Sequence, residues 1–338
     1  MSQLSKQQHA DLAQDSYENR VVTPPNKTLL IGGNHYRVLA VHKNPTTDYQ
    51  GVVYQDVRTN EIVVAHRGTS SLMDVNVDLK MVIHKANIQA EDAAKLTRIA
   101  LKAAKEFHDD HPEYNTPRIT QVGHSLGGTL AQIQSYRFKQ EGVTFNAYGA
   151  ASLNGIPKGG DKVINYSLAS DAVSAASPHY GKMVILAKEK ELIMLKLNGY
   201  SNHGGIPYLK ETVSPAAGSL LWSHGIANFT GINSILSERN YQPALELAER
   251  NKKLITDYRD DVNDYRNTLH KIGKGLSKTQ EMYHKVRKNN EDPNLMSWND
   301  KEEQYNFMQT VASFNPQSLP PEAQKLFDSV KGHMTAYH

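Results

Sequence analysis

Apolar and polar residues follow two different patterns along the chain, and the pattern changes near residue 240. Before that point, short β-like runs alternate with stretches of helical spacing, which favours a sheet covered by helices. The predicted strands span 35–43, 49–57, 61–67, 118–123, 143–149, 162–168, 182–188 and 192–198. The last two are expected to form a hairpin. Helices are predicted over 91–108 and 126–139.

The strand-like runs stop after residue 240. Apolar residues then recur at helical spacing along a long charged segment: Leu247, Leu254, Tyr258, Tyr265, Leu269 and Ile272. Shorter helical stretches follow the GKG at 273–275. The pattern predicts an α/β domain over 1–238 and an all-helical extension over 239–338, whose role the pattern does not define.

The stretch RITQVGHSLGGTLAQ joins a predicted strand to a predicted helix through Gly123, Ser125 and Gly127. In this setting G-x-S-x-G indicates a tight turn that exposes a serine hydroxyl, and the glycines let strand and helix approach. Ser125 would lie at the helix N-terminus, where the backbone N–H of Leu126 can hold a developing negative charge. The alternative is an ordinary glycine-rich turn.

A serine nucleophile needs a base and a carboxylate that orients the base, and in this architecture they follow in the order Ser, Asp, His. Asp171 comes just after the predicted strand 162–168, at the strand end expected to lie near Ser125. Asp161 is the rival, but it precedes the strand and would lie at the opposite edge. A solvated loop aspartate is the simpler alternative for Asp171.

The histidines downstream of Asp171 supply the candidates for the base. His224 is favoured because it lies between apolar residues and leaves enough chain to cross the sheet again. His203, in SNHGG, is the alternative, and His179 follows the aspartate too closely. His124, inside the serine motif, is expected to pack and form hydrogen bonds below the turn.

Composition narrows the possible chemistry. The 338 residues carry a formal net charge of +3 and include no cysteine, which excludes disulfides, thiolate metal sites and a Cys nucleophile. Lysine and arginine are dispersed, so nucleic-acid binding is not expected. The polar N-terminus lacks the apolar core of a signal peptide, and no apolar run could span a bilayer. We expect synthesis in the cytoplasm, with any export independent of such a signal.

With these residues placed, 1–238 resembles the class 3 lipases, a family of α/β-hydrolases. GHSLGG at 123–128 is similar to the family's serine turn residue for residue, and DAV at 171–173 resembles its acid-bearing segment. His224 agrees only in order and spacing. The resemblance implies an α/β-hydrolase fold, which is a mostly parallel sheet layered by helices.

A second segment, IVVAHRGTSSLMDVNVDL at 62–79, also resembles the family. In the family pattern the residue after the Arg-Gly turn supplies the second oxyanion donor, and this position is Thr69 here. An apolar strand ending in a glycine turn provides the backbone N–H that such a donor needs. Asp74 and Asp78 match later acidic positions, whereas Val75 replaces the usual tryptophan.

The resemblance implies ester hydrolysis through an acyl-enzyme on Ser125, with His224 as base and Asp171 as its partner, and with no metal or cofactor. It favours a lipase or phospholipase A1, whose lipid or phospholipid substrate brings transient contact with a membrane surface. Two apolar stretches, 79–88 and 224–236, suit a lipid interface, and the alternative is that both face the core.

Other functions stay open. Bacterial phospholipases of this type are often delivered into rival cells as antibacterial effectors, and the helical extension would then serve an immunity or delivery protein. A housekeeping lipase fits the same features. A hydrolase fold kept as a non-catalytic binding or scaffold module is the alternative of a different class. The presence of serine, aspartate and histidine candidates favours an enzyme.

Overall fold

The computed structural model describes residues 2–69, 79–153, 155–202, 221–264 and 266–267. The chain divides into two compact units, Met1–Arg266 and Asn267–His338. Helix α7 (Glu238–Arg250) and the helical residues 252–264 belong to the first unit. Most of the predicted extension lies outside the described residues, so the division at residues 238 and 239 stays a prediction.

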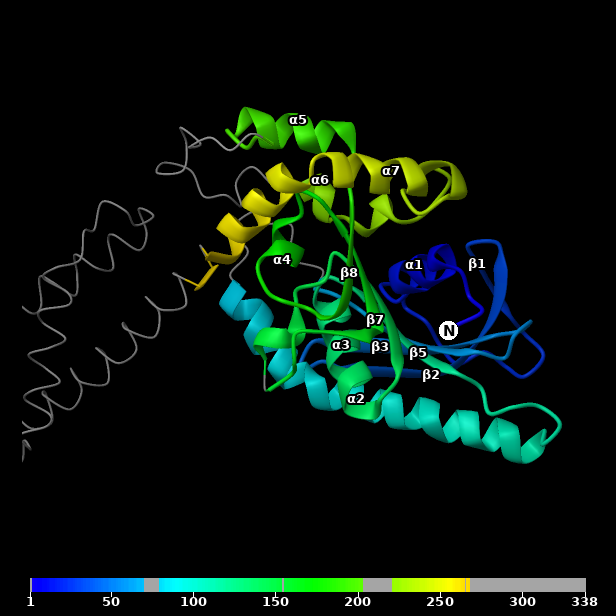
Figure 1. The fold of residues 1–338 in the computed structure, drawn as a ribbon. Helices are drawn as coiled ribbons and strands as arrows, with labels where there is room; N and C mark the ends of the chain where they lie inside the picture. Colours follow the sequence, from blue (N-terminus) through cyan, green and yellow to red (C-terminus); the bar gives the residue numbers. More distant parts are fainter. Residues whose placement is uncertain (1, 70–78, 154, 203–220, 265, 268–338) are drawn as a thin grey trace, which may run out of the picture. The chain divides into compact units, whose positions relative to one another are not determined.

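An eight-stranded sheet forms the centre of the first unit, and its strands lie side by side in sequence order (Figure 1). The antiparallel part contains β1 (Leu29–Ile31), β2 (Asn34–Asn44), β3 (Tyr49–Asp56) and β4 (Ile62–His66). Parallel pairing then joins β4 to β5 (Ile119–His124), β6 (Glu141–Phe145), β7 (Gly159–Leu168) and β8 (Tyr180–Leu186). The predicted fold class, an α/β-hydrolase with a mostly parallel sheet, is confirmed.

Helices cover both faces of this sheet. Along β4, Val64 points into a core shared with α2 (Leu79–Asp110) and α3 (Leu126–Phe138), while Val63 points into a core shared with α1 (Lys6–Asp15). Figure 1 shows α1 and α2 on opposite sides of the strands. Because each central strand is buried on both faces, it reads as a continuous apolar run.

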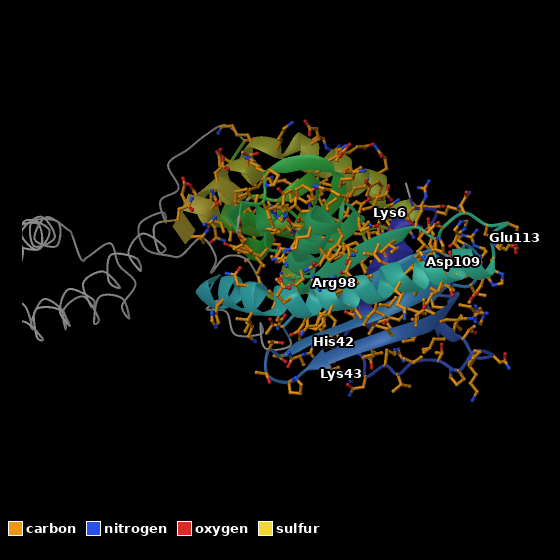
Figure 2. The ribbon with its side chains drawn as sticks, turned by 90° about the horizontal axis from the view of Figure 1, so that it is seen from below. Lys6, His42, Lys43, Arg98, Asp109 and Glu113 are labelled. Atoms are coloured by element: carbon orange, nitrogen blue, oxygen red, sulfur yellow. The ribbon has the colours of Figure 1, made fainter. Side chains whose placement is uncertain are left out.

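Helix α2 extends beyond the predicted 91–108 and lies against β2. His42 of β2 places its Nε2 atom 3.1 Å from a carboxylate oxygen of Asp92 on α2. The same carboxylate accepts hydrogen bonds from the side chains of Asn44 and Thr47, each at 2.7 Å. Figure 2 shows the helix passing over the strand that carries His42. This polar cluster fixes the helix along the antiparallel edge of the sheet.

The predicted strand at 192–198 is instead part of helix α5 (Glu189–Leu197), so the predicted hairpin is wrong. Leu192 and Leu195 lie one turn apart on the helix and are both buried, and burial of one face favours the helix. Glu191 accepts a hydrogen bond from the backbone N–H that precedes the helix, at 2.8 Å, which closes its first turn.

Among the described residues of the first unit, four histidines are buried: His9, His66, His124 and His179. Burial lowers the pKa of His9, His66 and His179 to about 4, and that of His124 to about 3. An unfolded histidine titrates near 6.5, so below this pH unfolding takes up protons. The contribution of these neutral histidines to the free energy of unfolding is complete above pH 6.5 and is lost as the pH falls.

We therefore expect acid to destabilise the protein steeply between pH 6.5 and 5. Each buried histidine removes up to about 1.4 kcal/mol of unfolding free energy per pH unit in this window. Urea midpoints followed by circular dichroism measure the effect. His66→Gln should make the pH dependence shallower, whereas His84→Gln, at an exposed site on α2, should leave it unchanged. A midpoint independent of pH from 7 to 5 contradicts the prediction.

Candidate active site

Ser125 occupies the turn between β5 and α3 with backbone angles φ 58° and ψ −128°. Residues with a side chain rarely adopt positive φ, and a strained strand-to-helix turn is what presents a serine hydroxyl. The flanking glycines leave no room for side chains. A Cβ on Gly123 would lie 2.3 Å from the backbone of Gly127, and one on Gly127 would lie 2.0 Å from the carbonyl oxygen of His66.

Asp171 follows the carboxyl end of β7 and caps the short helix α4 (Ala172–Ala175). One carboxylate oxygen accepts a hydrogen bond from the backbone N–H of Ser174 at 2.9 Å. The side chain is 1% exposed. Parallel strands end at the same edge of the sheet, so this position brings the carboxylate to the edge where β5 delivers the serine.

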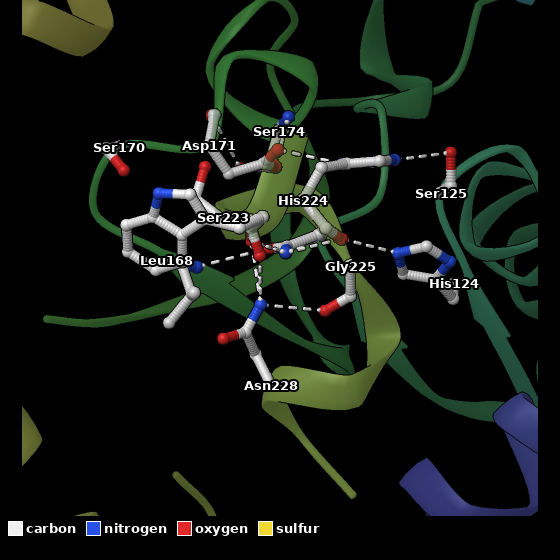
Figure 3. Close-up of polar contacts among 12 residues, drawn as sticks. His124, Ser125, Leu168, Ser170, Asp171, Ser174, Ser223, His224, Gly225 and Asn228 are labelled. Atoms are coloured by element: carbon white, nitrogen blue, oxygen red, sulfur yellow. Dashed lines mark hydrogen bonds and ion pairs between the residues drawn. The ribbon is translucent and has the colours of Figure 1, made fainter. Parts of the chain in front are cut away.

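His224, at the end of helix α6 (Leu221–His224), lies between these two side chains (Figure 3). Its Nδ1 atom is 2.8 Å from the Asp171 carboxylate, and its Nε2 atom is 3.0 Å from the Ser125 hydroxyl oxygen. The imidazole is 16% exposed, whereas the aspartate and serine are buried. The rival base, His203, lies outside the described residues.

The partners of each atom define where the protons lie. An ionised carboxylate only accepts, so Nδ1 of His224 donates to Asp171 and leaves Nε2 to accept the Ser125 proton. Burial by itself would raise the pKa of Asp171. Attraction to His224 and hydrogen bonds from His224 and Ser174 outweigh burial and hold this pKa below its usual value. The aspartate therefore stays ionised at neutral pH.

The acid loop, residues 169–176, is held by side chains from far along the chain. Three of them donate hydrogen bonds to its main-chain carbonyls: Tyr258 at 2.9 Å, Arg259 at 2.8 Å and Arg266 at 2.7 Å. Sequence reasoning assigned this helical segment to the extension and gave it no part in the site. No local motif marks the three residues, because their acceptors are backbone atoms of a distant loop.

Two further side chains hold the main chain around the candidate base. The Asn146 amide donates to the carbonyl oxygens of Ser223 and His224 at 2.7 and 3.0 Å and accepts from the Leu168 N–H at 2.9 Å. His124 places its Nε2 atom 2.7 Å from the same His224 carbonyl. Sequence reasoning missed Asn146, although a polar residue just after a buried parallel strand was an available signal.

The two predicted oxyanion donors lie on either side of the serine turn. Leu126 opens α3, so its backbone N–H is at the helix N-terminus beside Ser125. Thr69 is 8% exposed and follows Gly68, where an added Cβ would come within 3.3 Å of the Ser125 Cβ. The turn after β4 therefore packs directly against the serine. Asp74, Val75 and Asp78 lie outside the described residues.

The two apolar stretches expected at a lipid interface differ. In 224–236, Phe229 and Leu236 are buried in the core, while Ile232 is 95% exposed. In 79–88, Ile88 is 40% exposed. The structure does not describe the side chains of Met81, Val82 and Ile83. The stretch 224–236 thus faces the core for the most part.

The described residues contain no cluster of three or more His, Cys, Asp or Glu side chains able to hold a metal ion. Among their helices, none is both long and apolar enough to cross a membrane.

Several solved structures are similar to this chain. Lip2 lipase from Yarrowia lipolytica is 18% identical, with 53% of this chain and 78% of that chain covered and a TM-score of 0.40. A triacylglycerol lipase from Penicillium expansum is 19% identical, with 53% and 77% covered and a TM-score of 0.35. The Rhizomucor miehei lipase in its propeptide complex is 16% identical, with 46% and 58% covered and a TM-score of 0.32.

A protein family matches the chain over residues 8–176, which is half of its length, and is described as phospholipase-like, with a Tle-like phospholipase domain. The matched region includes Ser125 and Asp171 and ends before His224. The match confirms the expected kinship with lipases and phospholipases, and with it the hydrolysis of carboxylic esters of lipids. The chain belongs to the Tle-like phospholipase family.

Proposed function

We propose that the protein is a phospholipase A1 in which Ser125, His224 and Asp171 form the catalytic triad. The observation that carries the proposal is the continuous row of hydrogen bonds from the serine hydroxyl to the imidazole, at 3.0 Å, and on to the carboxylate, at 2.8 Å. A serine is a weak nucleophile unless an oriented base removes its proton. The row provides the base and the group that orients it.

In the first half of the reaction the Ser125 oxygen attacks the acyl carbonyl while its proton passes to Nε2 of His224. The carbonyl oxygen becomes an oxyanion, which the backbone N–H groups of Thr69 and Leu126 stabilise. Loss of one such donor typically costs about two to three orders of magnitude in rate. The imidazolium then protonates the departing glycerol oxygen, and the acyl group stays on the serine.

In the second half a water molecule replaces the alcohol. His224 takes a proton from the water, the resulting hydroxide attacks the acyl-enzyme, and the fatty acid leaves as the serine recovers its proton. Asp171 keeps the imidazole in one tautomer and stabilises its charged form throughout. In both halves the chain contributes the side chains of Ser125, His224 and Asp171 and the backbone N–H groups of Thr69 and Leu126.

Phospholipid is the proposed substrate because the family match is to a phospholipase domain, while the first acyl position follows from the resemblance to class 3 lipases. Purified full-length protein should release the sn-1 fatty acid from vesicles of a phosphatidylglycerol with two different acyl chains. Mass spectrometry of the products measures this. Release from sn-2 alone contradicts A1 specificity, and release of the headgroup contradicts acyl hydrolysis.

An active-site probe distinguishes the proposed enzyme from a non-catalytic binding module. A fluorophosphonate should label one residue, and peptide mapping should locate the adduct on Ser125. A protein that neither reacts with the probe nor hydrolyses any ester would be a binding module. The expected immunity or delivery partner and the route of export stay predictions.

A further inference from the structure

The hydroxyl of Tyr17, just after α1, lies between two parts of the candidate site. Its oxygen is 2.9 Å from Nδ1 of His124. Gly68 packs against the same oxygen: a Cβ on Gly68 would lie only 2.3 Å from it and 2.7 Å from the carbonyl oxygen of His124. Only a glycine can therefore occupy the position directly before Thr69.

Tyr17, His124 and the His224 carbonyl form a second row of hydrogen bonds, distinct from that of the proposed triad. The carbonyl is the one group that cannot donate, and it fixes the direction of both bonds. The carbonyl oxygen of His224 only accepts, so Nε2 of His124 carries a proton and donates to it at 2.7 Å. Burial lowers the pKa of His124 to about 3, so the ring is neutral at physiological pH and Nδ1 accepts. The Tyr17 hydroxyl must then donate to Nδ1, and its oxygen lies directly against Gly68.

We propose that Tyr17 is a positioning residue, which links the oxyanion turn at Gly68 and Thr69 to the main chain of the base through His124. The proposal rests on the proposed function of the site. The row joins the end of β4, the end of β5 and the segment that ends at His224, which are far apart in sequence. It therefore sets where the Thr69 N–H lies relative to the imidazole.

The row matters for catalysis because an oxyanion donor works only when it is aimed at the position that the oxygen takes in the transition state. Without the tyrosine hydroxyl, Gly68 and Nδ1 of His124 lose the atom that both contact, and the turn and the imidazole can move independently. The proposed mechanism gives Tyr17 no contact with the substrate. The defect should therefore appear in kcat and leave KM unchanged.

Tyr17→Phe removes only the hydroxyl, and the chain offers a matched control. Tyr36 is buried on β2, and its hydroxyl accepts a hydrogen bond from Gln8 of α1 at 3.1 Å. Tyr36→Phe thus also weakens the attachment of α1 but leaves the site alone. On a soluble p-nitrophenyl ester, full-length Tyr17→Phe should lose about 10- to 100-fold in kcat with KM within about twofold. Tyr36→Phe should keep the wild-type kcat.

A second measurement tests the row without using activity. In protein with ¹⁵N-labelled histidine, the His124 ring should appear as the neutral Nε2–H tautomer and should not titrate between pH 8 and 5. Tyr17→Phe should shift the ring signals of both His124 and His224, whereas Tyr36→Phe should shift neither. A protein without esterase activity that shows these signals would refute the proposed function and leave the row intact.

Three outcomes overturn the proposal. The first is a His124 ring that titrates near pH 6.5 or carries its proton on Nδ1, because either contradicts the direction of the hydrogen bonds. The second is a Tyr17→Phe enzyme with kcat within twofold of wild type. The third is an equal loss in Tyr36→Phe, which would mean that the attachment of α1 matters and the hydroxyl of Tyr17 does not.

Discussion

Ser125→Ala is expected to lower kcat for ester hydrolysis about a million-fold while the protein remains folded. Removing the nucleophile of a serine hydrolase costs about six orders of magnitude, and the oxyanion donors alone retain a weak residual activity. The hydroxyl makes no other hydrogen bond in the described structure than the one to His224. Its loss should therefore cost little stability. Thermal unfolding measures the stability, and an ester-hydrolysis assay measures kcat.

Ser135→Ala provides the matched control for this substitution. Ser135 is also buried and belongs to the helix that Ser125 opens, and its hydroxyl donates to the carbonyl of Glu141 at 3.3 Å. It lies three turns from the site, so the variant should keep its activity. If the Ser125 variant retained more than about a thousandth of the wild-type kcat, a serine mechanism at this residue would be refuted.

Gly127→Ala is expected to prevent the first unit from folding normally. The added Cβ would meet the carbonyl oxygen of His66 at 2.0 Å. The atoms that it would meet, in His66 and Arg67, all belong to the backbone, so no side-chain rotation relieves the overlap, and β4 and α3 would have to separate. Overpacking of this kind costs about 3 kcal/mol or more, a large part of the stability of an ordinary domain. Soluble yield and the urea midpoint measure the loss.

Gly225→Ala is the control for the glycine substitution. Gly225 has a φ of −60°, which any residue adopts, and its nearest neighbour to an added Cβ is 3.7 Å away. This variant should fold as the wild type does. A Gly127→Ala protein with an unchanged urea midpoint would show that the turn relaxes easily and would refute the steric role assigned to this glycine.

Sequence reasoning succeeded where one physical rule applied over a short distance. Strands buried on both faces, such as β4 and β5, read as apolar runs, and their alternation with helices predicts a sheet layered by helices. Strand ends share one edge of a parallel sheet, so Asp171 could be assigned to the edge of Ser125 before any coordinates were known. The turn glycines could be recognised because the motif fixes their spacing.

The parts that sequence reasoning missed depend on long-range contacts. Helix α1 is polar for most of its length and gave little apolar periodicity, so neither it nor Tyr17 was recognised. Helix α5 is too short for its spacing to distinguish a helix from a strand, and burial of Leu192 and Leu195 against the core decides between them. Arg259 contacts a loop residue 85 positions earlier, which no local pattern encodes.

The hold of Tyr258, Arg259 and Arg266 on the acid loop has a consequence for biosynthesis. A chain emerges from the ribosome from its N-terminus, and the serine turn and the acid loop are made well before these three residues. Until residues 258 to 266 have been added, the three carbonyls of that loop lack these donors. The nascent protein would therefore carry the proposed nucleophile for some time before the proposed carboxylate partner is held in place, so the proposed site would be completed late in synthesis.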